Sequence, residues 1–196
     1  MRKDYEIILN LIPENSKVLD IGCSDGELIT YLENKGISAQ GVELNQEKVI
    51  KCLEKGLDVI HGDINLIVED FPFNQFDYCL LTQTIQAVQE PDQLLNTLKK
   101  VSKNIIVSFN NSARLSKISN FLLTGSFDSL LKKANSDHWY NTDYIHPCSI
   151  KDFKKLATDL DLKIISTFDV LSQKKFENGK IPVSYTHLTL PTMMSV

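Results

Sequence analysis

Residues 18–26 decide the fold and read Val18-Leu19-Asp20-Ile21-Gly22-Cys23-Ser24-Asp25-Gly26. A short apolar run leads into two glycines, and a helical pattern begins directly afterwards at Glu27. Glycine permits a sharp turn and a close approach of the backbone to a ligand, and a helix N-terminus offers free N–H groups. The stretch therefore predicts a strand, a ligand-binding turn and a helix in direct succession.

The same alternation continues along the chain. Short apolar runs that are typical of strands lie at residues 18–21, 39–43, 58–61, 78–81, 105–109 and 162–170. Helical patterns lie at residues 3–12, 27–34, 46–55, 91–102 and 149–160. Local signals support them: Pro91 suits a first helical turn, Gly36 a left-handed helix end, and Ser149 with Asp152 a capping box.

This order of elements predicts an α/β protein, a Rossmann-like three-layer αβα sandwich around a mostly parallel central sheet. The 196 residues are enough for one domain with a single sizeable core. Ligands of such folds bind at the carboxyl ends of the strands.

Charge and hydropathy exclude several classes of partner. The net charge is −4, from 21 basic and 25 acidic residues, so no general field attracts a polyanion. We therefore expect neither nucleic acid nor a membrane surface as a partner. No apolar run after the N-terminus is long enough for a signal peptide or a membrane span, so we expect a cytoplasmic protein.

Two regions break the alternation. An insertion occupies about residues 110–147, with a partly helical pattern at 118–131 and a polar, aromatic loop at 135–141. Insertions of this length usually serve as lids, binding surfaces or interfaces.

The second break is the tail at residues 183–196, which contains no Lys, Arg, Asp or Glu. Residues 183–192 also resemble the translation of a transposase sequencing adapter. We therefore expect one domain at 1–182 and a non-native, adapter-derived tail at 183–196, which is left out of the fold prediction. On this interpretation the last strand of the sheet can be missing. The alternative is a genuine polar tail.

Acidic residues follow the predicted strands at the positions that a nucleoside ligand requires. Asp20 precedes a GxxxG turn, where a carboxylate suits the ammonium of a methionine moiety better than a pyrophosphate. Glu43 ends the second strand and can accept bonds from both ribose hydroxyls. Asp63 can take an adenine amino group with Ile64 against the ring, and Gln83 follows the fourth strand over the same crevice.

Each feature alone has an ordinary explanation. A glycine turn also occurs in dinucleotide-binding folds, and strand-end acids are often solvated loop residues. Their combination in the right order favours a cofactor site, for which the predicted binding residues are Asp20, Gly22, Cys23, Ser24, Asp25, Gly26, Glu43, Leu44, Asp63, Ile64 and Gln83.

The sequence resembles the class I methyltransferases in general and the MetW-type methionine biosynthesis proteins in particular. The resemblance covers residue 16 to about residue 170. Its motifs are Val18-Leu19-Asp20-Ile21-Gly22-Cys23, Gly41-Val42-Glu43, Phe76-Asp77-Tyr78, Leu81-Thr82-Gln83-Thr84-Ile85-Gln86-Ala87-Val88, Val107-Ser108-Phe109, Trp139-Tyr140-Asn141-Thr142 and Ile145-His146.

The resemblance implies a class I methyltransferase fold and a cofactor, S-adenosylmethionine (SAM) or S-adenosylhomocysteine (SAH). It also implies a role in methionine biosynthesis, in which the protein partners and activates a homoserine O-acyltransferase. It implies no methyl acceptor. Ser24 departs from the family pattern by replacing the glycine usual in the middle of the loop, and it can serve there if its φ is negative. Asn110 stands where the family commonly has proline.

Residues for chemistry are less well defined than those for binding. Methyl transfer from a sulfonium needs mainly alignment and a dry site, and His138, Tyr140 and His146 of the insertion are weak candidates for a base. They suit a structural or interface role better. His146 and Cys148 lack the further ligands of a zinc site, so we expect no metal. Cys23 is expected to pack the loop rather than to act as a nucleophile.

Three functions fit to different degrees. The first is the SAM-binding partner of the acyltransferase, and the second is an ordinary small-molecule methyltransferase. The loop spacing disfavours the third, a nicotinamide-dependent reductase.

Overall fold

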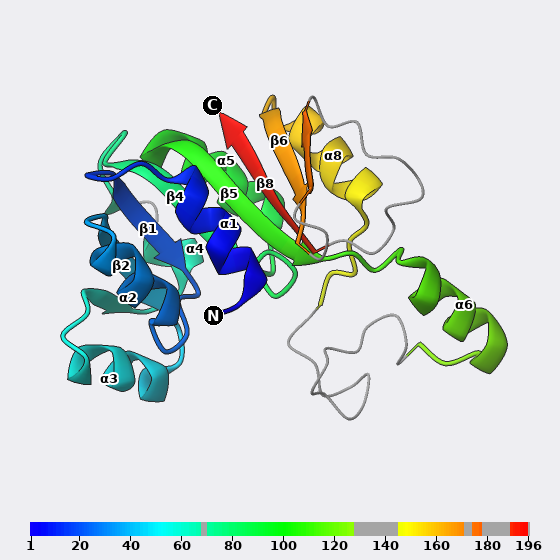
Figure 1. The fold of residues 1–196 in the computed structure, drawn as a ribbon, viewed down its shortest axis with the longest axis horizontal. Coiled ribbons are helices and arrows are strands. Elements are labelled where there is room, and N and C mark those ends of the chain that lie inside the picture. The colour runs from blue at the N-terminus through cyan, green and yellow to red at the C-terminus, as the bar shows by residue number, and fades with distance from the viewer. Residues whose placement is uncertain (68–69, 128–144, 171–173, 178–188, 196) are drawn as a thin grey trace.

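The structure is a computed structural model that describes residues 1–67, 70–127, 145–170, 174–177 and 189–195 (Figure 1). The described helices are α1 (Lys3–Leu11), α2 (Glu27–Asn34), α3 (Gln46–Glu54), α4 (Ile64–Ile67), α5 (Pro91–Val101), α6 (Leu115–Thr124) and α8 (Ile150–Asp159). The strands are β1 (Lys17–Ile21), β2 (Ser38–Glu43), β3 (Val59–His61), β4 (Phe76–Thr82), β5 (Ser102–Asn110), β6 (Lys163–Asp169), β7 (Lys174–Glu177) and β8 (Thr189–Ser195).

The strands form one sheet in the order β3-β2-β1-β4-β5-β8-β6-β7. The five strands from β3 to β5 pair in parallel, and β8 pairs antiparallel with both β5 and β6. From β1 the chain first builds the sheet outward through β2 and β3 and then returns to β4 on the other side of β1. The switch point therefore lies between β1 and β4, where α/β folds bind ligands at the carboxyl ends of the strands. The predicted α/β fold with a mostly parallel sheet is confirmed.

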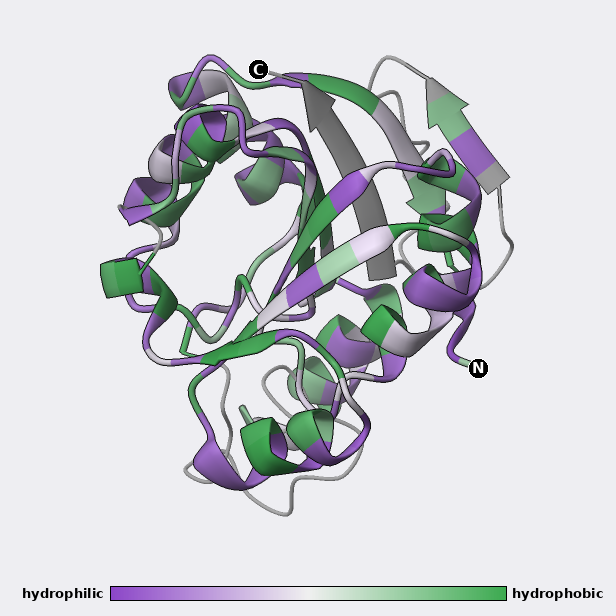
Figure 2. Ribbon diagram, turned by 90° about the vertical axis from the view of Figure 1, so that its left-hand side faces the viewer, coloured by the Kyte–Doolittle hydropathy of each residue, from purple (hydrophilic) through white to green (hydrophobic). Residues whose placement is uncertain are grey.

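Helices cover both faces of the sheet, as Figure 2 shows from the side. Alternate strand residues point to opposite faces, so neighbours such as Val18 and Leu19 belong to two different apolar clusters. One cluster joins the sheet to α1, α2 and α3, and the other joins it to α4, α5 and α8. The predicted three-layer sandwich follows directly from these two clusters.

Most local signals in the sequence also hold. Pro91 occupies the first turn of α5, Gly36 has a left-handed φ of 73°, and Ser149 and Asp152 form both bonds of a capping box. The helix expected at 118–131 begins earlier, at Leu115, and α6 ends at Thr124 because Gly125 adopts a left-handed φ of 66°.

The tail, which is left out of the fold prediction, contributes a strand. Thr189–Ser195 form β8 between β5 and β6. Without a strand at this position, β5 and β6 would both present unpaired main-chain groups to one another. The described part of the chain contains no helix that is long and apolar enough to cross a membrane.

Candidate functional site

The carboxyl ends of β1, β2 and β4 bring the predicted site together. The glycine loop follows β1, Glu43 ends β2, and Gln83 follows β4. Parallel pairing of β1 with both neighbours aligns these ends at one edge of the sheet. The sequence-predicted residues around the loop are therefore neighbours in space.

The glycine loop requires left-handed backbone at three positions, with φ of 71° at Gly22, 55° at Ser24 and 75° at Gly26. The N–H groups of Gly22 and Cys23 both donate to the Val42 carbonyl, which ties the loop to β2. Ser24 does not have the negative φ under which a serine was expected to serve in this loop. Ser24 adopts the left-handed φ that the glycine usual at this position would adopt without strain. The hydrogen bond from its N–H to Glu43 stabilises this conformation.

Glu43, at the end of β2, binds the glycine loop through its carboxylate. Its carboxylate accepts the N–H of Ser24 at 2.8 Å through one oxygen and the N–H of Asn45 at 2.8 Å through the other. The side chain is buried. A carboxylate offers about four lone pairs, so two main-chain bonds leave acceptor capacity for hydroxyl donors.

Asp20 is a buried carboxylate with one unsatisfied oxygen. The residue is 1% exposed, Oδ1 accepts the Thr82 hydroxyl at 3.4 Å, and Oδ2 has no hydrogen-bond partner among the described residues. Burial raises the pKa of Asp20 to about 7, and Glu43 adds to the rise. A buried acceptor without a partner is costly, and a cationic donor would satisfy it.

Asp63 and its neighbours form the side of the site next to β3. The Gly62 N–H donates to the Glu43 carbonyl, and Asp63 Oδ1 accepts both the main-chain and the side-chain N–H of Asn65. Ile64 belongs to the core cluster and is 9% exposed, whereas Leu44, beside Glu43, is 68% exposed.

Gln83 has a left-handed φ of 60° directly after β4. Its N–H donates to both the carbonyl and the hydroxyl of Ser108, at 2.8 and 3.1 Å. The next residue, Thr84, donates its hydroxyl to the Ile21 carbonyl and lies against Gly22, where a Cβ would stand 2.7 Å from Thr84 Oγ1. Strained backbone of this kind often marks a functional site.

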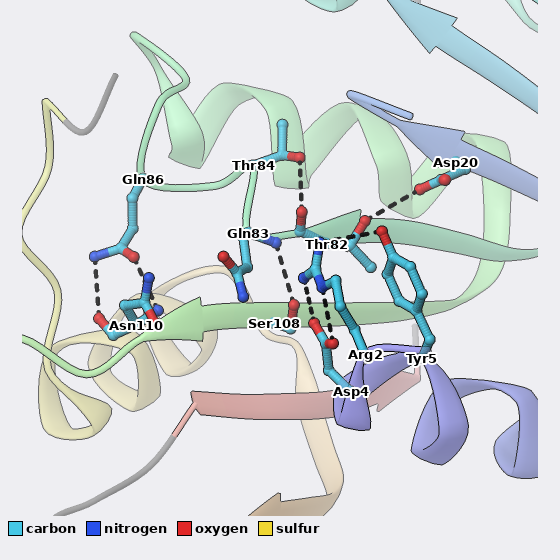
Figure 3. Close-up of polar contacts among 10 residues, drawn as sticks. All are labelled: Arg2, Asp4, Tyr5, Asp20, Thr82, Gln83, Thr84, Gln86, Ser108 and Asn110. Atoms are coloured by element: carbon cyan, nitrogen blue, oxygen red, sulfur yellow. Dashed lines mark hydrogen bonds and ion pairs between the residues drawn. The ribbon is translucent and has the colours of Figure 1, made fainter. Parts of the chain in front are cut away.

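Gln86 is a structural residue that the sequence analysis did not single out. It is buried, and its side chain accepts the Asn110 N–H and donates to the Asn110 carbonyl (Figure 3). The same side chain also donates to the His146 carbonyl. Its own carbonyl accepts the N–H groups of Ile145 and His146. Gln86 thus joins the loop after β4 to both ends of the insertion. The family motif around it was the available signal.

The start of α1 was also missed as part of the site. Arg2 pairs with the buried Asp4 and donates to the Tyr5 hydroxyl at 3.0 Å (Figure 3). The Arg2 charge acts on Asp20 and opposes the rise in its pKa that burial causes. Arg2 and Asp4 resemble an ordinary helix start in sequence, so only the fold reveals their position.

The residues considered for a catalytic role lie in different environments. His138 and Tyr140 lie outside the described residues. His146 is exposed, and its Nε2 lies 3.0 Å from the Gln89 carbonyl oxygen. Burial raises the pKa of Cys23, whose sulfur packs against Gly41, so it fills space as predicted. Within the described residues, no three His, Cys, Asp or Glu side chains group in a way that could hold a metal.

Comparison with known proteins agrees with this geometry. The family model for "Methionine biosynthesis protein MetW" matches residues 2–188. The chain belongs to the MetW family. A relative in Rhodopirellula baltica, the "Bifunctional methionine biosynthesis protein MetXA/MetW", is 32% identical over 170 residues. These cover 82% of this chain but only 27% of that relative, so the MetW chain spans about a quarter of the longer protein.

Solved structures show the fold of this MetW-family chain. A SAM-dependent methyltransferase from Methanosarcina mazei has a TM-score of 0.68 at 16% identity, covering 96% of each chain. The plantazolicin methyltransferase BamL, solved in complex with a triazolic desmethylPZN analogue and SAH, has a TM-score of 0.69 at 14% identity. That match covers 98% of this chain and 80% of BamL. The predicted class I methyltransferase fold is confirmed.

Proposed function

We propose that this chain binds SAM or SAH at the carboxyl ends of β1, β2 and β4 and activates a homoserine O-acyltransferase in methionine biosynthesis. The observation that carries the cofactor assignment is the unsatisfied Oδ2 of buried Asp20 beside the left-handed glycine loop. An ammonium supplies the missing donor, either directly or through one water molecule.

The other binding residues follow from their positions. Glu43 would accept the ribose hydroxyls, Asp63 the adenine amino group, and Gln83 would lie over the crevice. Leu44 and Ile64 would offer apolar surface to the ring. The loop residues Gly22, Cys23, Ser24, Asp25 and Gly26 would pass close to the ligand with their backbone. SAM, when bound, supplies an electrophilic methyl group on a sulfonium.

The partner assignment is supported by family membership and by the MetXA/MetW relative, whose name joins two methionine biosynthesis activities in one chain. Co-purification with the acyltransferase, and a rise in acyltransferase activity on mixing, are the expected results. Failure to form a complex at micromolar concentrations would exclude the partnership.

A small-molecule methyltransferase is the second candidate, because the loop is intact and the structural neighbours include SAM-dependent methyltransferases. Transfer of a labelled methyl group from SAM to members of a metabolite panel tests it. Turnover without the acyltransferase would favour this candidate, and silence across the panel would favour the first.

A further inference from the structure

The start of α1 lies on the same face of the sheet as Asp20. Tyr5 belongs to the apolar cluster that contains Val18 and Leu80. Side chains alternate along a strand, so Asp20 and Thr82, each two residues further on, point to that face as well. Their mutual hydrogen bond agrees with this placement. Figure 3 shows Arg2 and Tyr5 projecting from α1 toward the end of β4 that carries Thr82.

The Arg2 guanidinium is held in a fixed orientation. Its Nε donates to Asp4 Oδ1 at 3.1 Å, its Nη2 pairs with Asp4 Oδ2, and its Nη1 donates to the Tyr5 hydroxyl. The carbon at its centre lies 4.4 Å from the Tyr5 ring centroid. A guanidinium has five N–H donors, so these three bonds leave two, and the side chain stays partly exposed.

The same placement brings the Arg2 charge within electrostatic reach of two carboxylates that flank the glycine loop. Burial raises the pKa of Asp20, just before the loop, and Arg2 opposes that rise. Asp4 raises the pKa of Arg2 against the effect of burial, and Glu27, directly after the loop, adds to the rise. The Arg2 charge thus interacts with carboxylates on either side of Gly22–Gly26.

The proposed ligand carries a complementary pair of charges at its amino-acid end, an ammonium and a carboxylate. We propose that Arg2 recognises the α-carboxylate of the methionine moiety, while Asp20 takes the ammonium and Asp4 positions the guanidinium. Planar guanidinium groups bind carboxylates with paired N–H donors, and Asp4 pre-orients that fork. This assignment rests on the proposed cofactor and extends the site to an element outside the glycine loop.

Three ligands that differ at the amino-acid end distinguish the contribution of the carboxylate from that of the ammonium. SAM carries both charges, decarboxylated SAM keeps the ammonium and sulfonium but lacks the carboxylate, and 5′-methylthioadenosine lacks the amino-acid end. Calorimetric titrations of the intact chain with each ligand are made for the parent, Arg2→Gln, Asp4→Asn and Asp20→Asn. Lys3→Gln, at an exposed neighbouring position, is the matched control.

Arg2→Gln is expected to weaken SAM about tenfold or more while leaving decarboxylated SAM within about twofold, since one charge-assisted bond is lost. Asp4→Asn should show the same split to a smaller extent. Asp20→Asn should weaken SAM and decarboxylated SAM but not 5′-methylthioadenosine.

Two results would overturn the assignment. Equal weakening of SAM and decarboxylated SAM by Arg2→Gln would mean that Arg2 only supports the fold of α1, and no weakening of either would place it outside the site. If the parent bound none of the three ligands, the proposed cofactor itself would fail, which is a distinguishable result.

Discussion

Glu43 Oε2 accepts the Ser24 N–H at 2.8 Å, so the acid that ends β2 also fixes the strained centre of the glycine loop. One carboxylate therefore has two tasks. It holds the loop in its left-handed conformation, and in the proposed complex it faces the ribose. Loop conformation and ligand affinity are expected to change together when this residue is altered.

Gly22→Ala should destabilise the protein more than Gly36→Ala, although both glycines have a left-handed φ. At Gly36 an added Cβ meets nothing within 4 Å, so only strain of about 1 kcal/mol is expected. At Gly22 it stands 2.7 Å from Thr84 Oγ1, which adds about 1–3 kcal/mol of overpacking. Urea unfolding measures both variants.

Thr84→Ala in the Gly22→Ala background isolates the steric part. The double-mutant cycle should show a favourable coupling of about 1 kcal/mol, because the crowding atom is removed. Equal costs at Gly22 and Gly36 would show that the loop and Thr84 are not in contact.

Asp20→Asn should stabilise the free protein at neutral pH while weakening its ligand. The folded-state pKa of about 7 lies above the ordinary 3.8, so the folded protein binds the proton more strongly than the unfolded chain. The Asp20 contribution is therefore most favourable below pH about 4 and is lost as the pH rises through 7. Asparagine removes this loss, which is on the order of a few kcal/mol.

Chemical unfolding of the parent and Asp20→Asn between pH 4 and 8 tests this sign. The advantage of the variant should grow with pH up to about 7 and then level off, because above that pH Asp20 is ionised in both the folded and the unfolded parent. A difference that does not vary with pH would contradict a buried, titrating Asp20.

Gln86→Leu should cost about 2–4 kcal/mol, because the buried Gln86 side chain loses its three hydrogen bonds to Asn110 and His146. Hydrogen exchange provides the local readout: the Asn110 amide should lose protection, whereas the Gln83 amide, bonded to Ser108, should keep it. Gln89→Leu, at an exposed position, is the control. Unchanged protection at Asn110 would rule out the proposed connection.

The fold could be predicted from local signals because they agreed with the tertiary structure. The strand and helix patterns, Pro91 and the Ser149 capping box each specify their element without distant contacts. Asp20 and Glu43 could be predicted as site residues because parallel strands bring their carboxyl ends to one edge.

Other features depend on contacts between distant residues and were not visible in the sequence. The left-handed φ of Ser24 depends on its bond to Glu43, 19 residues away. Strand β8 exists because β5 and β6 both pair with it, which no pattern within the tail indicates. Arg2 acquires its place only when α1 packs onto the sheet, in the apolar cluster that joins Tyr5 to Val18 and Leu80. The origin of residues 183–196 in a sequencing adapter stays a prediction.

The central claim is that Glu43 and the glycine loop bind SAM, and calorimetric titration with SAM and SAH tests it most directly. The parent should bind both ligands, Glu43→Ala should bind at least about tenfold more weakly through loss of charge-assisted bonds, and Glu47→Ala, exposed on α3, should match the parent. Thermal unfolding verifies that each variant is folded, with Glu43→Gln as the substitute if alanine is not tolerated. Glu43→Ala binding as tightly as the parent would contradict the account.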